Sequence, residues 1–120
     1  MNRRRRGVVT DPDHSDRRLQ GSAHSLPYSV IWDAALALAH RMSRWVVVSA
    51  DSGKGEIVAE ATSHFAGFVD DVVIRVSLDD QGLTRVDLSS HSRVGRFDFG
   101  ANRRRVQKYL RRLEKSIAAD

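Results

Sequence analysis

The sequence contains no cysteine, only two prolines, and no apolar run long enough to span a bilayer. The absence of cysteine excludes disulfides, zinc–thiolate sites and cysteine nucleophiles. A membrane-spanning helix needs about 20 consecutive apolar residues. The basic run at residues 3–6 has no apolar region behind it, so it does not fit a secretory signal. These absences favour a domain of a reducing compartment without a transmembrane segment, and we expect a cytoplasmic location.

The positive charge is unevenly distributed along the 120 residues, which are enough for one domain. Residues 1–25 have a net charge of +3 and residues 99–120 a net charge of +5, whereas residues 26–98 have a net charge of −3. The overall value of +5 therefore comes from the two ends of the chain. The middle of the chain is mildly acidic, which does not fit a continuous nucleic-acid-binding surface.

The first 25 residues are rich in Arg, Asp, Ser and Gly and poor in periodic apolar positions. Such a segment buries too little apolar surface to offset the entropy of ordering it. We therefore expect a flexible basic tail over residues 1–25 and a single α+β domain over residues 26–120. The tail could contact nucleic acid nonspecifically through Arg3, Arg4, Arg5 and Arg6, but we favour a solvated terminus.

Hydrophobic periodicity predicts the element order α-β-β-β-β-α. The first helix is expected to follow Ser29 as its N-cap, and the last to begin near Phe99 with Asp98 as its N-cap. The strands are expected at residues 45–50, 56–63, 71–78 and 84–91. Short turns join them, so we expect a four-stranded antiparallel meander with both helices packed on one face. The expected core residues are Trp32, Leu36, Ile57, Ile74, Val76, Val86, Leu88, Val106 and Leu110.

Patterns for catalysis or metal binding are weak. Ser90, His91 and Asp98 supply the residue types of a hydrolase, but no Gly-x-Ser-x-Gly turn is present. Neighbouring residues on a strand point to opposite faces, so His91 cannot easily serve Ser90. No histidine pair has helical i, i+4 spacing and no ligand spacing recurs. We expect no metal and no cofactor.

One polar group is predicted to gather at a single end of the sheet. The turn at residues 79–82 pairs the third and fourth strands, which brings the start of one near the end of the other. The group consists of Asp70, Asp71, Ser92, Arg93, Arg96, Asp98 and Asn102. It could be a structural lock, in which Arg93 bonds the Asp70 or Asp71 carboxylate. Alternatively, Arg93, Arg96 and the helix N-terminus could bind an anion. We favour the lock, because the carboxylates already neutralise the arginines.

Two segments also carry a resemblance to a known family. They are GFVDDVVIRV at residues 67–76 and RVDLSSHSRVGRFDFGANRRRV at residues 85–106. Together with the segment from the first helix to Trp45, they resemble the domain-of-unknown-function 1499 family over about residues 28–114. The resemblance implies a small α/β domain and brings no established reaction. Many members of that family have a membrane segment or a Cys-containing stretch upstream, and this sequence has neither.

These patterns favour a binding or accessory module over an enzyme. Such a module would use the open face of the sheet or the loop of Arg93 and Arg96, with a protein or a small anion as partner. The alternatives are a hydrolase centred on residues 90–98 and a weak, nonspecific nucleic-acid binder. A salt-bridged loop would favour the module, whereas a pocket with unpaired polar groups would favour the enzyme.

Overall fold

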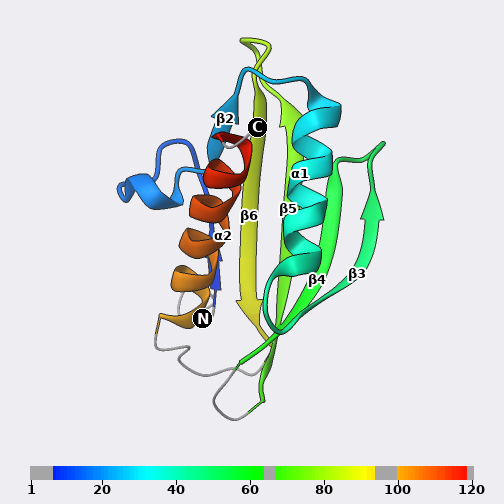
Figure 1. The fold of residues 1–120 in the computed structure, drawn as a ribbon. Helices are drawn as coiled ribbons and strands as arrows, with labels where there is room; N and C mark the ends of the chain where they lie inside the picture. Colours follow the sequence, from blue (N-terminus) through cyan, green and yellow to red (C-terminus); the bar gives the residue numbers. More distant parts are fainter. Residues whose placement is uncertain (1–6, 64–66, 94–99, 119–120) are drawn as a thin grey trace.

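The computed structural model describes residues 7–63, 67–93 and 100–118. Within these residues, two helices and a 3-10 turn accompany a six-stranded antiparallel sheet (Figure 1). The elements are β1 (Gly7–Val9), η2 (Arg17–Leu19), β2 (Ser22–His24), α1 (Tyr28–Arg41), β3 (Trp45–Asp51), β4 (Glu56–Thr62), β5 (Val69–Leu78), β6 (Thr84–Ser92) and α2 (Ala101–Ala118). Neither helix of the described chain is long and apolar enough to cross a membrane.

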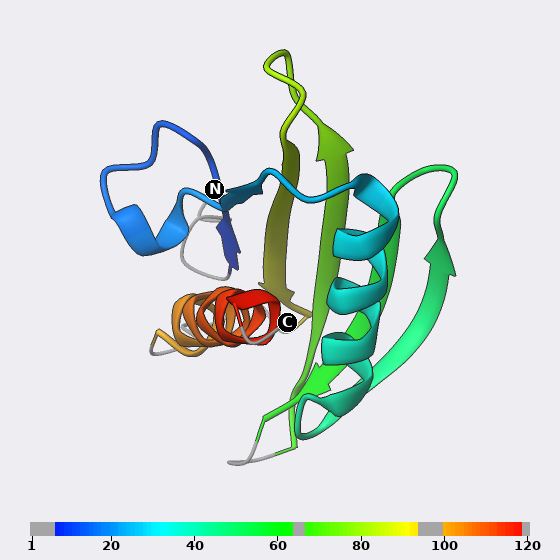
Figure 2. The ribbon, with the colours of Figure 1, turned by 45° about the horizontal axis from the view of Figure 1, so that its top comes forward.

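The predicted meander is confirmed for β3 to β6, which lie side by side in sequential order. Both helices cover the same face of this sheet, as Figures 1 and 2 show from two directions. The class is therefore α+β, as expected. The sheet is larger than predicted, because β1 and β2 both pair with the edge of β6 that does not pair with β5.

The expectation of a flexible tail is wrong for residues 7–25. Gly7 lies opposite His91 in β6 and Ser22 lies opposite Val86, so β1 and β2 form one interrupted edge strand. At the interruption, the Leu88 backbone N–H donates to the Thr10 hydroxyl at 3.0 Å. Leu19 of η2 joins the core and is 1% exposed. Strands of three residues and a single buried leucine are too short to produce a recognisable hydrophobic periodicity in the sequence. Residues 1–6 lie outside the described part of the chain.

The core lies between the helices and the inner sheet face. Alternate residues of β4, β5 and β6 are buried, which is the period of a half-buried strand. Of the nine predicted core residues, eight are buried, and Leu36 is partly buried against them. The N-cap of α1 is Pro27 rather than Ser29, which lies inside the first turn. Proline suits this end of a helix because the early N–H groups have no intrahelical partner.

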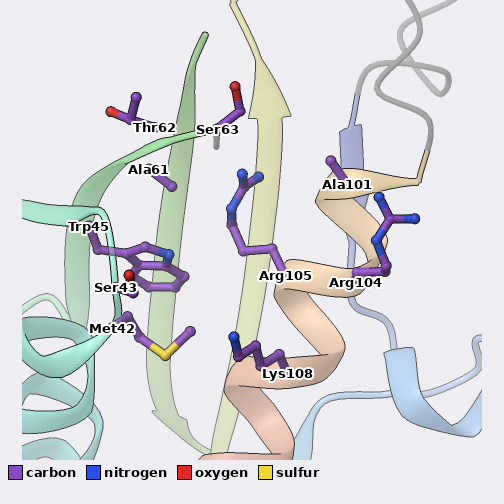
Figure 3. Close-up of a pocket in the computed structure, with 10 residues that line it drawn as sticks. All are labelled: Met42, Ser43, Trp45, Ala61, Thr62, Ser63, Ala101, Arg104, Arg105 and Lys108. Atoms are coloured by element: carbon purple, nitrogen blue, oxygen red, sulfur yellow. The ribbon is translucent and has the colours of Figure 1, made fainter. Parts of the chain in front are cut away.

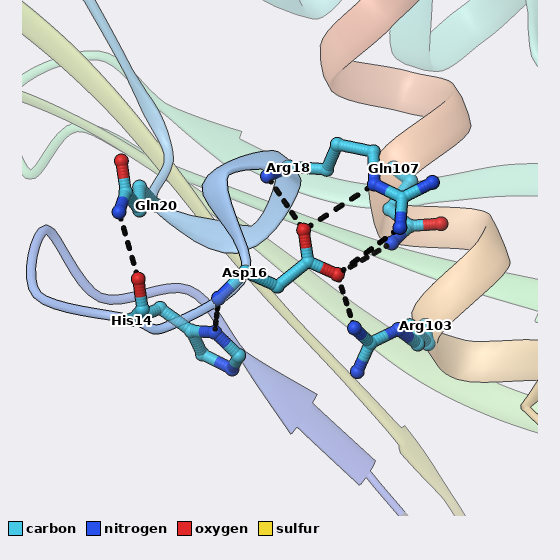
Figure 4. Close-up of polar contacts among 6 residues, drawn as sticks. All are labelled: His14, Asp16, Arg18, Gln20, Arg103 and Gln107. Carbon is cyan, nitrogen blue, oxygen red and sulfur yellow. Dashed lines mark hydrogen bonds and ion pairs between the residues drawn. The ribbon is translucent and has the colours of Figure 1, made fainter.

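The loop between β1 and β2 is held against α2 by Asp16 (Figure 4). Its carboxylate accepts hydrogen bonds from the Arg18 backbone N–H at 2.9 Å and from the Gln107 amide at 3.3 Å. It also forms an ion pair with Arg103. The backbone hydrogen bond from Arg18 is the main reason that the pKa of Asp16 falls to about 2. This contact joins the edge strand to the helical layer.

Candidate functional site

A buried polar cluster lies where β5 begins, β6 ends and α2 begins. The Asp70 carboxylate and the Ser90 hydroxyl come from the inner face of the sheet, and Asn102 and Arg105 come from the first turns of α2. Asp70 is 4% exposed, and Ser90 and Asn102 are fully buried. Four polar side chains are thus placed inside an otherwise apolar layer.

The Arg105 guanidinium is the centre of this cluster. Its Nη1 donates to Asp70 Oδ2 at 2.8 Å, to Asn102 Oδ1 at 2.9 Å and to Ser90 Oγ at 3.1 Å. Ser90 Oγ donates to Asn102 Oδ1 at 2.6 Å. Asn102 Nδ2 donates in turn to Ser92 Oγ at 2.9 Å. Every member therefore has a partner, as a buried charge requires.

The described residues contain no buried side-chain nitrogen or oxygen without a hydrogen-bond partner. The adjacent His91 does not reach Ser90, because it lies on the opposite face of the sheet, across from Asp71. The hydroxyl hydrogen of Ser90 is donated to Asn102. A nucleophilic serine needs a base within hydrogen-bond reach. The cluster therefore has the chemistry of a structural bridge between sheet and helix.

A second ion cluster lies on the outer face of the sheet. Arg93 Nη2 donates to Asp71 at 2.8 Å and to Glu60 at 2.7 Å, and Arg93 Nε also donates to Asp71 at 3.1 Å. Glu60 and Asp71 lie directly opposite each other on β4 and β5, so Arg93 separates two like charges. The hydrogen bonds from Asp71 and Glu60 raise the pKa of Arg93.

The predicted polar group is therefore divided between two faces. Asp71 and Arg93 lie on the outer face, whereas Asp70, Ser92 and Asn102 lie on the inner face. Asp70 bonds Arg105 instead of Arg93. The prediction placed Asp70 and Asp71 in one group because they are neighbours in the sequence, yet consecutive residues of a strand point to opposite faces. Arg96 and Asp98 lie outside the described residues.

An open pocket of about 430 Å³ adjoins the buried cluster (Figure 3). It lies between the end of α1, the first residue of β3, the end of β4 and the first turns of α2. Its lining consists of Met42, Ser43, Trp45, Ala61, Thr62, Ser63, Ala101, Arg104, Arg105 and Lys108. Three cationic residues thus share this lining with apolar groups and hydroxyls, and none of the described lining residues is acidic.

Packing against Tyr109 fixes the indole of Trp45 in this pocket. The two rings are stacked at 5.5 Å between centroids, with an interplanar angle of 6°. The Tyr109 hydroxyl donates to the Ala35 carbonyl at 2.7 Å, and burial raises the pKa of Tyr109. The apolar wall of the pocket is therefore held by the core itself.

The sequence did not identify this pocket. In the sequence, Arg104, Arg105 and Lys108 have the spacing of residues on the solvated side of an amphipathic helix. Their relation to Trp45 depends on how α2 crosses the sheet, and helical periodicity does not contain that information. One feature of the sequence could have indicated the pocket. The spacing of Ala101, Arg105 and Lys108 places a small residue and two cations along one face of the helix.

A second cavity, of about 660 Å³, lies beside β1. Its lining mixes the backbone of Gly7 with His14, His91 and Arg103, among others. His14 Nδ1 accepts a hydrogen bond from the Asp16 backbone N–H at 2.9 Å. Within the described chain, no group of three or more His, Asp or Glu side chains is placed to hold a metal ion. Its lining combines an acidic residue, Asp11, with Arg103, whereas the described lining of the pocket beside Trp45 is basic without an acid.

The fold and the two polar clusters define a small α+β domain: an antiparallel sheet tied to a basic helix by a partly buried arginine. The sequence model of the family described as "Protein of unknown function (DUF1499)" matches residues 6–113, and the chain belongs to that family. The match includes β1, β2 and the loop between them. No curated protein matches the chain, and no solved structure does.

Proposed function

We propose that this protein is a non-catalytic binding module that takes a small amphipathic anion into the pocket beside Trp45. The observation that carries the proposal is the composition of the lining: Arg104, Arg105 and Lys108 on one side, and Trp45, Met42 and Ala61 on the other. A ligand that satisfies both walls has a carboxylate, sulfonate or phosphate group joined to an apolar body.

The position of the pocket adds to its preference for anions. It lies at the first turns of α2, which is 18 residues long. The N-terminal end of a helix has a partial positive charge, which adds to that of the side chains. The volume of about 430 Å³ is in the usual range for small-molecule sites. Arg105 is already bonded to Asp70, and the pocket-lining Lys108 is exposed, so Lys108 is the cation that we expect to meet the anion.

The alternative, a hydrolase centred on residues 90–98, is less well supported. The Ser90 hydroxyl is bonded to Asn102, and His91 lies on the other face of the sheet. The outer-face site is also a weaker candidate, because Arg93 is already paired with Asp71 and Glu60. A cytoplasmic location and an anionic partner remain part of the proposal.

The test measures binding of anilinonaphthalenesulfonate, an anionic aromatic probe, by the quenching of tryptophan fluorescence. We expect saturable one-to-one binding that Lys108→Gln weakens about tenfold, the range of one hydrogen bond to a charged group. Lys115→Gln is the matched control, because Lys115 lies on the same helix, is also exposed, and does not line the pocket.

The neutral analogue phenylnaphthylamine separates charge from apolar contact. Its affinity should be the same in wild type and Lys108→Gln, and Trp45→Phe should abolish most of the quenching by either probe. Equal losses in Lys108→Gln and Lys115→Gln would refute the pocket as the site. So would the absence of saturable binding by the folded wild type.

A further inference from the structure

The exposed charges of this molecule are segregated between its two faces. Within the described helices, exposed Arg or Lys occupies seven positions, and the only exposed acids are Asp33 and Glu114. The basic positions are Arg41, Arg103, Arg104, Lys108, Arg111, Arg112 and Lys115, of which Arg103 forms an ion pair with Asp16. On the outer sheet face the arginines are paired with carboxylates: Arg75 with Glu56, Arg85 with Asp87, and Arg93 with Asp71 and Glu60.

Four of the helical cations form a single row, here called the outer stripe: Arg104, Lys108, Arg111 and Lys115. Their spacing of four, three and four residues places them on one side of α2. The buried residues of the helix, among them Val106, Tyr109 and Leu113, lie on the opposite side. The stripe therefore points away from the sheet, and its first two members also line the pocket.

We infer that the outer stripe docks this protein onto an anionic lipid bilayer, and that the pocket takes its amphipathic anion from that surface. The second part rests on the proposed function, whereas the docking itself rests on the segregated charge. A row of cations on a helix is attracted by anionic headgroups, and each Lys or Arg near the surface strengthens binding about fivefold.

An exposed apolar side chain beside the pocket favours a bilayer over a nucleic acid. Phe68 is 37% exposed, and its backbone is bonded to Ser63, which lines the pocket. A bilayer offers both anionic headgroups and acyl chains to such a surface. A nucleic acid offers phosphates, but no flexible apolar chain that would fill a pocket lined by Trp45 and Met42.

The docking experiment measures co-sedimentation of the full chain with vesicles at low and high salt. Vesicles of equal parts phosphatidylcholine and phosphatidylserine should bind the protein, and vesicles of phosphatidylcholine alone should not. The double variant Arg111→Gln/Lys115→Gln should weaken binding about 25-fold, at about fivefold for each charge. Neither substituted residue lines the pocket, so this variant should bind anilinonaphthalenesulfonate as wild type does.

The matched control is Arg17→Gln/Lys54→Gln, which makes the same change of net charge at exposed positions of η2 and the β3–β4 turn. It should retain most of the affinity for vesicles. Equal losses in both double variants, or no binding by wild type, would overturn the inference. Displacement of the protein from vesicles by duplex DNA at equal phosphate concentration would also overturn it, in favour of nucleic acid. Probe binding without vesicle binding would leave the pocket in place and remove only the docking.

Discussion

Arg105 has two roles in this structure, because one guanidinium belongs both to the buried cluster and to the wall of the pocket. Its side chain is 12% exposed and that of Asp70 is 5% exposed. A lysine would provide a point charge on a flexible stem, whereas the rigid fork of arginine can hold several acceptors at once. The residue type at this position is therefore determined by the inner cluster and not by the pocket alone.

Arg105→Met should destabilise the fold by about 3–5 kcal/mol, because it leaves the Asp70 carboxylate buried and without its cation. Urea unfolding measures the loss. Arg111→Met, a substitution of the same type at an exposed position of the same helix, should change stability by no more than about 0.5 kcal/mol.

The double variant Arg105→Met/Asp70→Asn distinguishes a charge effect from lost packing. It should recover a large part of the stability, since the unpaired charge is gone. An Arg105→Met protein as stable as Arg111→Met would contradict the assignment of this pair as a buried lock.

The loop between β1 and β2 depends on Asp16 for its contact with α2. Its pKa of about 2 lies below the ordinary value of 3.8, so the ionised form is favoured in the folded state. The resulting stabilisation is complete above about pH 4 and is lost as the pH falls through about 2. We expect the melting temperature of wild type to fall over this interval.

Asp16→Asn should remove the part of this acid dependence that belongs to Asp16, and its melting temperature at neutral pH should be lower than that of wild type. Thermal melts between pH 5 and pH 2, read by circular dichroism, give both quantities. Asp13→Asn, an exposed position of the same loop, is the control and should behave as wild type does. Identical acid profiles for wild type and Asp16→Asn would show that the ionised Asp16 carboxylate does not stabilise the fold.

At the level of elements, a strong hydrophobic periodicity was sufficient to predict a helix or strand, and a weak one was not. The alternation from Glu56 to Thr62 and the apolar stripe of α2 predicted both the elements and their buried faces. By contrast, β1 and β2 are three residues each, and their pairing with β6 is determined by long-range contacts.

The candidate site was predicted only in part, for a geometric reason. The pairing of β5 with β6 correctly brought Asp71 near Arg93, because register follows from the short turn between them. The partner of Asp70 comes from α2, and the angle at which a helix crosses a sheet depends on side-chain packing. Periodicity placed Arg105 on the helix but did not place it against Asp70.

The whole molecule depends on its N-terminal segment to cover β6. Deletion of residues 1–25 removes β1, β2 and the buried Leu19, and exposes one side of β6. We expect this truncated protein to melt at a much lower temperature than wild type and to self-associate, because an uncovered strand edge pairs with other chains.

Deletion of residues 1–6 alone leaves the described elements intact and is the matched control for this truncation. Light scattering and thermal melts compare the two deletions. Equal stability of both truncated proteins would show that residues 7–25 do not contribute to the stability of the fold.

The opposite edge of the sheet, formed by β3, is also an uncovered strand edge that could pair with other chains. From Trp45 to Ala50, β3 has no charged residue, and Val46 and Val48 are 64% and 55% exposed. The register of β3 against β4 shifts between Val47 and Ser49. This bulge makes the spacing of the outward N–H and C=O groups irregular, so a flat incoming strand cannot match them along its length. We therefore expect this irregularity in the ladder to hinder the addition of further strands at an edge whose apolar composition would otherwise promote it.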